Sequence, residues 1–272
     1  MKPYKWISRL ILLMYAFLIA APLYFVLISA FKDSNAFFAH PLGWPKPLTL
    51  SNFQALFDQQ PMLKYFGNSI VVTLSTVLLV LLLGSLVAYA IVRLGGYSGR
   101  ILFALYVAGL IVPSQVNMLP IYSLVRKLGW SNHLSGLVVV SIAMLLPLTV
   151  FMLTGFMRML NREILEASSI DGGGEWTLYW RMALPLSAPS LAACSTFLFV
   201  MVWNDLLIPM LMINSNEKLT LPLALMQFRG EYVTSYTTLL AGVVAAALPI
   251  AILFVFLQRY FVEGMTSGAV KG

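Results

Sequence analysis

Few side chains in this sequence could take part in chemistry, and the first group of them surrounds a single acid in an apolar run. Asp205 follows Trp203 and Asn204 in the stretch VWNDLLIPML. An ionisable group inside a membrane is costly and usually faces a cavity or another polar group. Asn204 could therefore bond hydroxyl groups of a solute and Trp203 could stack on a ring, but an interhelical hydrogen bond or a position near the outer membrane interface explains Asp205 equally well. Gln115 and Asn117, between two prolines, are weaker candidates of the same kind.

The second group lies in a polar stretch, residues 158–186, which contains the sequence EASSIDGGGEWTLYWRMALPL. This stretch is 29 residues long and holds four of the ten acids of the chain: Glu163, Glu166, Asp171 and Glu175. Two neighbouring helices need only about 2–8 residues to connect them. The stretch is therefore predicted to be a structured element and not a bare connection.

The pattern inside this stretch predicts a short amphipathic helix over residues 163–171. Asn161 suits the N-cap, and Gly172–Gly174 end the helix because glycine accepts the left-handed conformation. Such a helix of about two turns is not stable alone in water, so it must dock on the ends of its own bundle or on a cytoplasmic partner. The following residues include side chains that favour the membrane interface, namely Trp176, Tyr179 and Trp180. Pro185 then starts the return into the bilayer.

The composition places the whole chain in the membrane class. Of its 272 residues 60% are hydrophobic and only 10% are charged, whereas a soluble domain carries about 25% charged residues. The net charge of +7 comes from scattered residues, which form none of the basic faces that nucleic-acid binding requires. Cys194 is the only cysteine, and His40 and His133 lie far apart. Disulfides, metal sites and nucleic acid are therefore not expected.

Charge-free intervals predict six membrane-spanning helices, since about 20 apolar residues cross the hydrocarbon. These intervals are apolar all round, whereas strands of a closed barrel alternate apolar and polar residues. The expected fold is an all-α polytopic membrane protein in which residues 1–272 form one transmembrane domain and the loop 158–186 joins spans 4 and 5. The spans are expected at about residues 10–31, 67–92, 101–125, 134–157, 187–213 and 235–258. Gly84 with Ala88, and Gly242 with Ala246, have the spacing that lets helices pack closely.

The basic residues predict the orientation of the chain. An even number of spans puts both termini on one side, and a cytoplasmic N-terminus leaves ten Lys and Arg residues inside and seven outside. The cluster before the first span weighs most. The ten are Lys2, Lys5, Arg9, Arg93, Arg100, Arg158, Arg162, Arg181, Arg259 and Lys271. Both termini and the loop 158–186 are therefore expected in the cytoplasm.

The polar loop resembles the EAA loop of ABC importer permeases. In that pattern a Glu-Ala-Ala triplet is followed by a glycine and later by Ile-x-Leu-Pro; here Glu166-Ala167-Ser168 precede Gly172, and Met182-Ala183-Leu184-Pro185 follow. Ser168 and Met182 depart from the pattern by conservative changes. The resemblance implies that this loop docks on an ATPase subunit and that its short helix 163–171 is a cytoplasmic coupling helix between spans 4 and 5. The docking residues carried over are Glu166, Ala167, Ser168, Ile170, Asp171, Gly172, Leu184 and Pro185.

The resemblance extends over nearly the whole chain. LTLSNFQALF, VPSQVNMLPIYSLVRKLGWSNHLSGLV, VWNDLLIPML, TLPLALMQFRGEY and LQRYFVEGMTSGAVKG are similar to segments of carbohydrate-type permeases. Within that group they look like the maltose-permease G-like branch, which handles oligosaccharides and glycerol 3-phosphate. This resemblance implies a permease subunit in a prokaryotic plasma membrane that imports a sugar, an oligosaccharide or a sugar-like solute by alternating access.

The same resemblance implies the partners. They are a second, homologous permease subunit, two cytoplasmic ABC ATPase subunits and an extracytoplasmic solute-binding protein, besides the membrane lipid. The chain contains no G-x-x-x-x-G-K-[ST] phosphate loop, so it lacks that device for binding ATP. No cofactor is expected in this chain, and ATP with its Mg²⁺ belongs to the ATPase partners.

Three other functions are alternatives to this one. A permease for another solute, such as amino acids or peptides, is the nearest alternative. A polytopic membrane enzyme would need a nucleophile–base pair or paired acids at membrane depth, and Asp205 is alone within its span. A channel would need a repeated pore lining and would have no use for the acidic, glycine-hinged loop. The chain is therefore not expected to be an enzyme.

Overall fold

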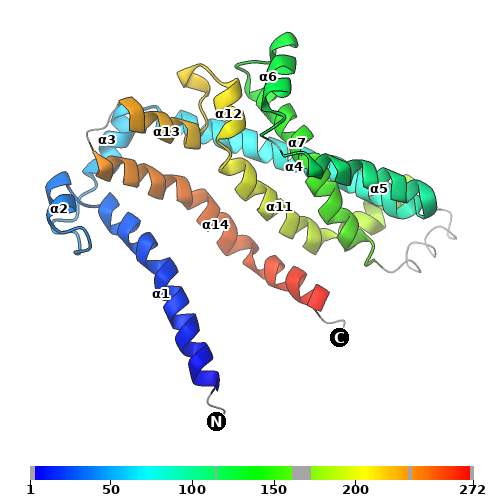
Figure 1. The fold of residues 1–272 in the computed structure, drawn as a ribbon, viewed down its shortest axis with the longest axis horizontal. Coiled ribbons are helices and arrows are strands. Elements are labelled where there is room, and N and C mark those ends of the chain that lie inside the picture. Colours follow the sequence, from blue (N-terminus) through cyan, green and yellow to red (C-terminus); the bar gives the residue numbers. More distant parts are fainter. Residues whose placement is uncertain (1–3, 114, 161–172, 232–234, 270–272) are drawn as a thin grey trace.

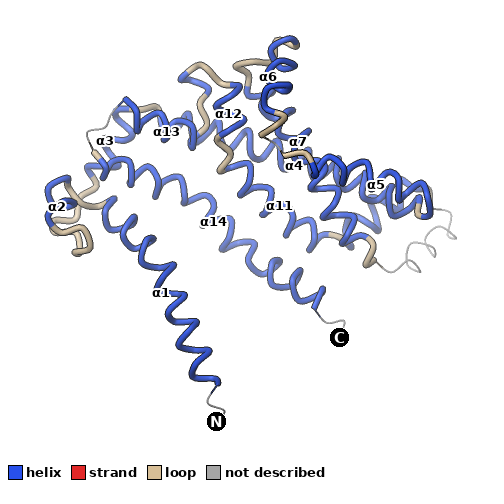
Figure 2. The backbone as a smooth tube through the Cα atoms, in the orientation of Figure 1, coloured by secondary structure: helices blue, strands red, loops and turns tan. Residues whose placement is uncertain are grey.

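The computed structural model describes residues 4–113, 115–160, 173–231 and 235–269, and the described part of the chain is helical with no strand. The predicted coupling helix 163–171 lies outside these residues. The elements, shown in Figures 1 and 2, are α1 Tyr4–Ala30, α2 Ser34–Ala39, α3 Ser51–Gln59, α4 Met62–Leu94, α5 Gly96–Ile111, α6 Met118–Lys127, α7 Leu134–Met157, α9 Glu175–Leu178, the π-helix η1 Tyr179–Ala183, α10 Leu184–Leu186, α11 Ala188–Trp203, α12 Leu207–Met212, the 3₁₀ turn η2 Asn216–Lys218, α13 Leu221–Glu231 and α14 Tyr236–Ala269.

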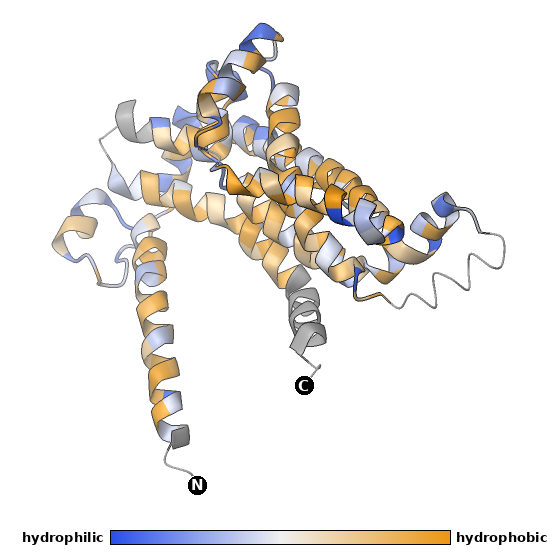
Figure 3. Ribbon diagram, turned by 45° about the vertical axis from the view of Figure 1, so that its right-hand side comes forward, coloured by the Kyte–Doolittle hydropathy of each residue, from blue (hydrophilic) through white to orange (hydrophobic). Residues whose placement is uncertain are grey.

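Four of the described helices are long and apolar enough to cross a membrane. They are Trp6–Ala30, Met62–Leu94, Leu134–Met157 and Tyr236–Phe256, where the first, second, fourth and sixth spans are predicted. A fifth crossing results if residues 175–186 and Ala188–Trp203 form one span with a bend of 73° between its parts. Figure 3 shows the apolar residues running along the long helices, with hydrophilic residues gathered mainly beyond the helix ends. The chain is thus a multi-pass helical membrane protein.

The structure differs from the sequence prediction at residues 101–125, where one span was expected. Helix α5 ends at Ile111, the backbone of Val112 is extended (φ −82°, ψ 117°), and α6 starts only at Met118. Pro113 explains the break, because proline has no N–H to donate and disfavours helical geometry in the residue before it. The third predicted span is therefore interrupted, and two helices, α5 and α6, take its place.

The predicted span 187–213 is also interrupted. Helix α11 ends at Trp203, and α12 begins at Leu207. Asp205 lies in this interruption, and its side chain accepts hydrogen bonds from the first amides of α12. A polar side chain that satisfies the exposed amides of a helix start stabilises that start. The acid that the sequence places inside a span thus lies where the helix stops and starts again.

Helix α4 forms the centre of the bundle and packs along α7. A Cβ atom at Gly84 would lie 2.6 Å from the Thr149 Cγ2 atom of α7, so the two helices approach closely, as the small-residue spacing predicts. Helix α11 lies against both α4 and α14. Figure 1 shows α1 meeting the other helices near its C-terminal end and diverging toward its N-terminus, so most of its apolar surface is uncovered.

The bundle has two ends, the Asn132 end and the Arg93 end, each called after one residue that lies there. At the Asn132 end, the Asn132 side chain accepts bonds from Asn214 N, Ser215 N and Ser215 Oγ, which ties the segment before α7 to the segment after α12. At the Arg93 end lie the last turn of α4 and the start of α9. Helices α4 and α7 both start at the Asn132 end, since Asn68 of α4 bonds the Glu217 carbonyl there.

Near the same end as Asn132, a buried polar cluster fastens α1 to the bundle. Asn52 Nδ2 of α3 donates to the Ala30 and Lys32 carbonyls at 2.8 and 2.7 Å, and Asn52 Oδ1 accepts from Thr237 Oγ1 of α14 at 2.9 Å. Lys32 is buried and donates to the His40 and Pro41 carbonyls. Burial lowers the pKa of its ammonium group, and the two carbonyls offset part of that cost.

Candidate functional site

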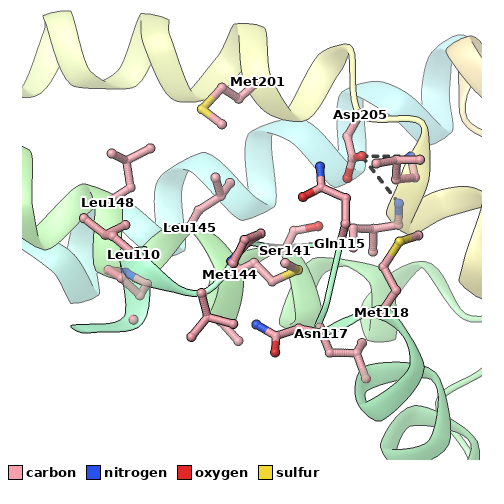
Figure 4. Close-up of a pocket in the computed structure, with 18 of the residues that line it drawn as sticks. Leu110, Gln115, Asn117, Met118, Ser141, Met144, Leu145, Leu148, Met201 and Asp205 are labelled. Atoms are coloured by element: carbon pink, nitrogen blue, oxygen red, sulfur yellow. Dashed lines mark hydrogen bonds between the residues drawn. The ribbon is translucent and has the colours of Figure 1, made fainter. Parts of the chain in front are cut away.

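A cavity of about 800 Å³ lies between the break of α5 and α6, the middle of α7, and the break of α11 and α12 (Figure 4). The two interrupted helices supply two of its walls, since residues before and after each break line it. A cavity of this size is in the range of small-molecule sites, which are usually lined by apolar groups with a few polar ones. The cavity is therefore the candidate solute site of this chain.

Asp205 stands at one edge of the cavity. Its Oδ1 atom accepts from Leu207 N at 3.0 Å and from Ile208 N at 3.4 Å, the two bonds drawn as dashed lines in Figure 4. These bonds engage Oδ1 alone. One residue thus performs two tasks: it caps α12 and brings a carboxyl group to the cavity wall.

The structure brings three of the five predicted path residues together. Asp205, Gln115 and Asn117 all line the cavity, although Asp205 is some 90 positions away from the other two. Figure 4 shows the Gln115 side chain close to Asp205, with Asn117 farther along the same side. Amide and carboxyl groups both exchange hydrogen bonds with hydroxyl groups. This side of the cavity can therefore bind a polar, hydroxyl-bearing solute.

The other two predicted residues lie elsewhere. Trp203 is buried in the core with 1% of its surface exposed; its Nε1 donates to the Ala246 carbonyl of α14 at 3.0 Å, and its ring stacks on Phe199. Asn204 Nδ2 donates back to the Val200 carbonyl of its own helix at 2.8 Å. Neither residue lines the cavity. Trp203 joins two helices instead of offering its ring to a solute.

Sequence reasoning missed Ser141, a polar residue in the middle of α7 that lines the same cavity. A lone serine in an apolar helix gives no signal, because such residues often bond only their own backbone. Much of the remaining lining is apolar, including Leu110, Leu145 and Leu148, which Figure 4 shows away from Asp205. Because α7 starts at the Asn132 end and Ser141 precedes Leu145 and Leu148, the polar part of the cavity lies nearer that end.

The predicted docking loop is described only in part. Glu166, Ala167, Ser168, Ile170, Asp171 and Gly172 lie outside the described residues. Leu184 and Pro185 form the start of α10, which continues the helical run from Glu175, and the 73° bend comes after Leu186, later than expected. The π-helix Tyr179–Ala183 comes directly before Leu184 and Pro185. Because proline has no N–H to donate to the preceding turn, the regular pattern of backbone hydrogen bonds is interrupted here.

The aromatic residues after the glycines divide between two environments. Trp176 and Trp180 are exposed, at 65% and 41% of their surface, as expected for side chains at a membrane interface. Tyr179 is buried, with 1% of its surface exposed. Among the described residues, no three His, Cys, Asp or Glu side chains cluster so that they could hold a metal ion.

Long apolar helices packed in a bundle around a partly polar cavity define a multi-pass membrane protein with an internal solute-sized site. The sequence matches the family described as binding-protein-dependent transport system inner membrane component over residues 80–267. The chain belongs to this family.

Several relatives are similar to this chain over nearly their whole length. Arabinooligosaccharides transport system permease protein AraQ of Halalkalibacterium halodurans is 33% identical over 98% of this chain and 97% of that protein. Multiple sugar-binding transport system permease protein MsmG of Streptococcus mutans is 32% identical over 93% of this chain and 92% of that protein. Probable ABC transporter permease protein YurM of Bacillus subtilis is 32% identical over 96% and 87%.

A solved structure has the same fold. It is the crystal structure of a bacterial ABC transporter involved in the import of the acidic polysaccharide alginate, and the similarity has a TM-score of 0.83 at 18% identity over 95% of this chain and 96% of that one. The alginate transporter in complex with an alginate pentasaccharide-bound periplasmic protein is also similar, with a TM-score of 0.67 at 15% identity. At these identities the likeness concerns the fold.

Proposed function

We propose that this chain is a membrane-spanning permease subunit of an ATP-driven importer for a sugar, an oligosaccharide or a sugar-like solute. The observation that carries the proposal is the full-length similarity, at 33% identity, to a permease for arabinooligosaccharides. A sugar offers hydroxyl groups around a ring with apolar faces. The cavity provides the matching groups, since Asp205, Gln115 and Asn117 stand on one side and leucines on another.

The proposed topology has six crossings, with α5–α6 and α11–α12 as the third and fifth, each interrupted. The Arg93 end would face the cytoplasm together with both termini, and the Asn132 end would face outward. The excess of basic residues on the proposed cytoplasmic side supports this orientation. The polar part of the cavity would then lie toward the side from which solute arrives.

The energy would come from separate ATPase subunits that dock on the loop 158–186. In this proposal Glu166 is a polar anchor, Ala167 and Ser168 allow close approach beside Ile170 and Asp171, and Gly172 permits the turn. Closing of the ATPases would move the loop and rock the permease halves between outward- and inward-facing states, a rigid-body transition of packed bundles. Gly172→Leu is expected to uncouple the subunits, and unchanged uptake by that variant would refute its role.

Two further partners are proposed. A second permease subunit would complete the pathway, and the uncovered apolar length of α1 offers surface to that subunit or to lipid. A solute-binding protein would deliver the solute at the Asn132 end. The family description and the alginate transporter captured with its periplasmic protein support this arrangement.

The test is to purify the chain with its partner subunits and reconstitute the complex in vesicles. ATP hydrolysis and uptake would then be measured with oligosaccharides, monosaccharides, glycerol 3-phosphate, amino acids and short peptides, each with the cognate binding protein. Stimulation by a carbohydrate is expected. Stimulation by amino acids or peptides alone would favour the nearest alternative, a permease of the same family for a different solute.

A further inference from the structure

The segment that follows the docking loop is fastened to α4 by two rows of side chains. Ser85, Tyr89 and Arg93 are spaced four residues apart on α4, so they share one face of the helix. Glu175 and Tyr179 have the same spacing in α9 and η1. The two rows meet along their length, with Arg93 and Tyr89 on Glu175 and Ser85 on Tyr179.

Toward the Arg93 end, the two rows meet in an ion pair between Arg93 and Glu175, and Tyr89 is a second donor to the same carboxylate. Arg93 Nε donates to the two Glu175 oxygens at 2.9 and 3.0 Å, and Arg93 Nη2 lies 2.9 Å from Oε1. The Tyr89 hydroxyl donates to Oε2 at 2.8 Å. An isolated exposed ion pair contributes little to stability, but a carboxylate held by several charge-assisted bonds has a fixed position. Glu175 is therefore held in one place on α4.

The inner contact is buried. Ser85 Oγ lies 2.8 Å from the Tyr179 hydroxyl, and the Tyr89 and Tyr179 rings are in contact with centroids 5.5 Å apart. Ser85 Oγ also lies 3.0 Å from the Leu82 carbonyl of its own helix and donates to it. Its proton is therefore used, and Tyr179 is the donor to Ser85. Both side chains are almost completely buried.

These contacts lie directly before an interruption of the helical backbone. Between Glu175 and α11 the chain passes through a π-helix and then bends by 73°. The π-helix and the bend interrupt the regular helical hydrogen bonds, so residues 175–203 do not form one continuous helix. A push on the loop would be absorbed there unless the segment is attached to a straight element. Helix α4, 33 residues long, is that element.

The far end of α4 reaches the polar side of the cavity. Asn68 Nδ2 donates to the Glu217 and Leu219 carbonyls, and Ser69 Oγ accepts from Leu221 N, so α4 holds the segment that follows α12. A small adjoining cavity is lined by Ser69 and Thr73 of α4 together with Asp205. Helix α4 thus contacts the loop-side segment at one end and the surroundings of Asp205 at the other.

We propose that Ser85, Tyr89, Arg93, Glu175 and Tyr179 form a latch that makes α4 and the segment after the docking loop move as one body. The latch converts a displacement of the loop into a displacement of α4. The movement of α4 then changes the surroundings of Asp205 at the cavity. Its members are positioning residues, since none of them lines the cavity. This inference rests on the proposed function, because it assumes that an ATPase moves the loop.

The experiment measures solute imported per ATP hydrolysed by the complete complex in vesicles with its binding protein. The variants are Glu175→Gln, Arg93→Met and the double variant. Matched controls are Asp58→Asn, which removes an exposed acid of α3, and Arg100→Met, which removes an exposed arginine of α5. Co-purification of the ATPase and thermal denaturation report assembly and folding.

Each latch variant is expected to keep its ATPase subunits and its ATP hydrolysis but to import at least about fivefold less solute per ATP, the lower end of couplings between distant sites. The double variant is expected to lose no more than the worse single variant, because residues of one unit are not additive. The controls should match the wild type. Wild-type import per ATP in both latch variants, or additive losses in the double variant, would overturn the latch.

The two proposals fail in different ways. If the wild-type complex hydrolyses ATP but imports only amino acids or peptides, the proposed solute class is wrong, and the latch variants are then compared with that solute. If the wild type imports carbohydrate and the latch variants lose ATPase binding together with uptake, the contacts serve assembly and the latch is wrong. The charge exchange Arg93→Glu with Glu175→Arg is expected to regain part of the lost coupling, which a loss of folding would not allow.

Discussion

Replacing Asp205 by asparagine and by alanine separates its two roles. The asparagine Oδ1 atom can still accept from Leu207 N and Ile208 N, so Asp205→Asn keeps the cap of α12 and removes only the carboxyl character at the cavity wall. Asp205→Ala removes both. Loss of a helix cap costs about 0.5–2 kcal/mol, which lowers the melting temperature by roughly 2–4 °C per kcal/mol for a chain of about this size.

The effect of Asp205→Asn on transport follows from a weaker solute contact, because the amide can still bond a hydroxyl, but more weakly than an ionised carboxylate. A hydrogen bond to a charged group contributes about 1.5–3 kcal/mol and one between neutral groups about 0.5–1.5 kcal/mol, so the solute concentration needed for half-maximal uptake should rise roughly 5- to 10-fold. Uptake would be measured in vesicles over a range of solute concentrations, with melting temperature as the control. Asp205→Asn should melt like the wild type but need more solute, whereas Asp205→Ala should show both defects. If Asp205→Asn imports normally, Asp205 is only a cap and leaves the solute path.

The remaining predictions concern packing, a buried hydrogen bond and the docking loop. Gly84→Ala should lower the melting temperature, since its Cβ would lie 2.6 Å from a side chain of α7 and overpacking costs about 1–3 kcal/mol; Gly155→Ala, which meets nothing within 4 Å, should not. Ser85→Ala should lower the stability of the folded protein by about 1–3 kcal/mol, because it leaves the buried Tyr179 hydroxyl without an acceptor. Tyr179→Phe should lower it by only about 1 kcal/mol. Equal melting temperatures of the two variants would contradict the assignment of Tyr179 as the donor. Glu166→Lys should abolish co-purification of the ATPase or uptake, and wild-type behaviour in both would remove this residue from the docking surface.

The long helices could be predicted from the sequence, but the interruptions could not. Charge-free runs locate α1, α4, α7 and α14 because crossing a membrane imposes length and apolarity on each helix separately. Proline gives an ambiguous signal: Pro22, Pro147 and Pro249 lie inside helices that continue, whereas Pro113 ends one. Whether a helix survives its proline depends on neighbours that satisfy the freed carbonyl, and a single sequence does not show those neighbours.

The candidate path residues show the same division. Asp205, Gln115 and Asn117 are candidates because polar groups are rare in apolar runs, and the fold gathers them at one cavity. Trp203 is a candidate because it is near Asp205 in the sequence and has a ring that could stack on a solute. Trp203 is the last residue of α11 and packs toward α14, whereas Asp205 lies beyond the end of that helix and lines the cavity. Proximity in the sequence was a poorer guide than residue type.

The features that defeat the prediction of continuous spans also line the cavity. Residues before and after both interruptions form parts of its wall, and the first amides of α12 find a partner in Asp205. Walls made of helix ends can shift with small changes at the breaks, whereas the closely packed pair of α4 and α7 resists such changes. In the proposed transport cycle the interrupted helices would therefore move relative to α4 and α7. The contacts of α4 with Glu175 at one end and with Leu221 at the other place that helix between the loop and the cavity.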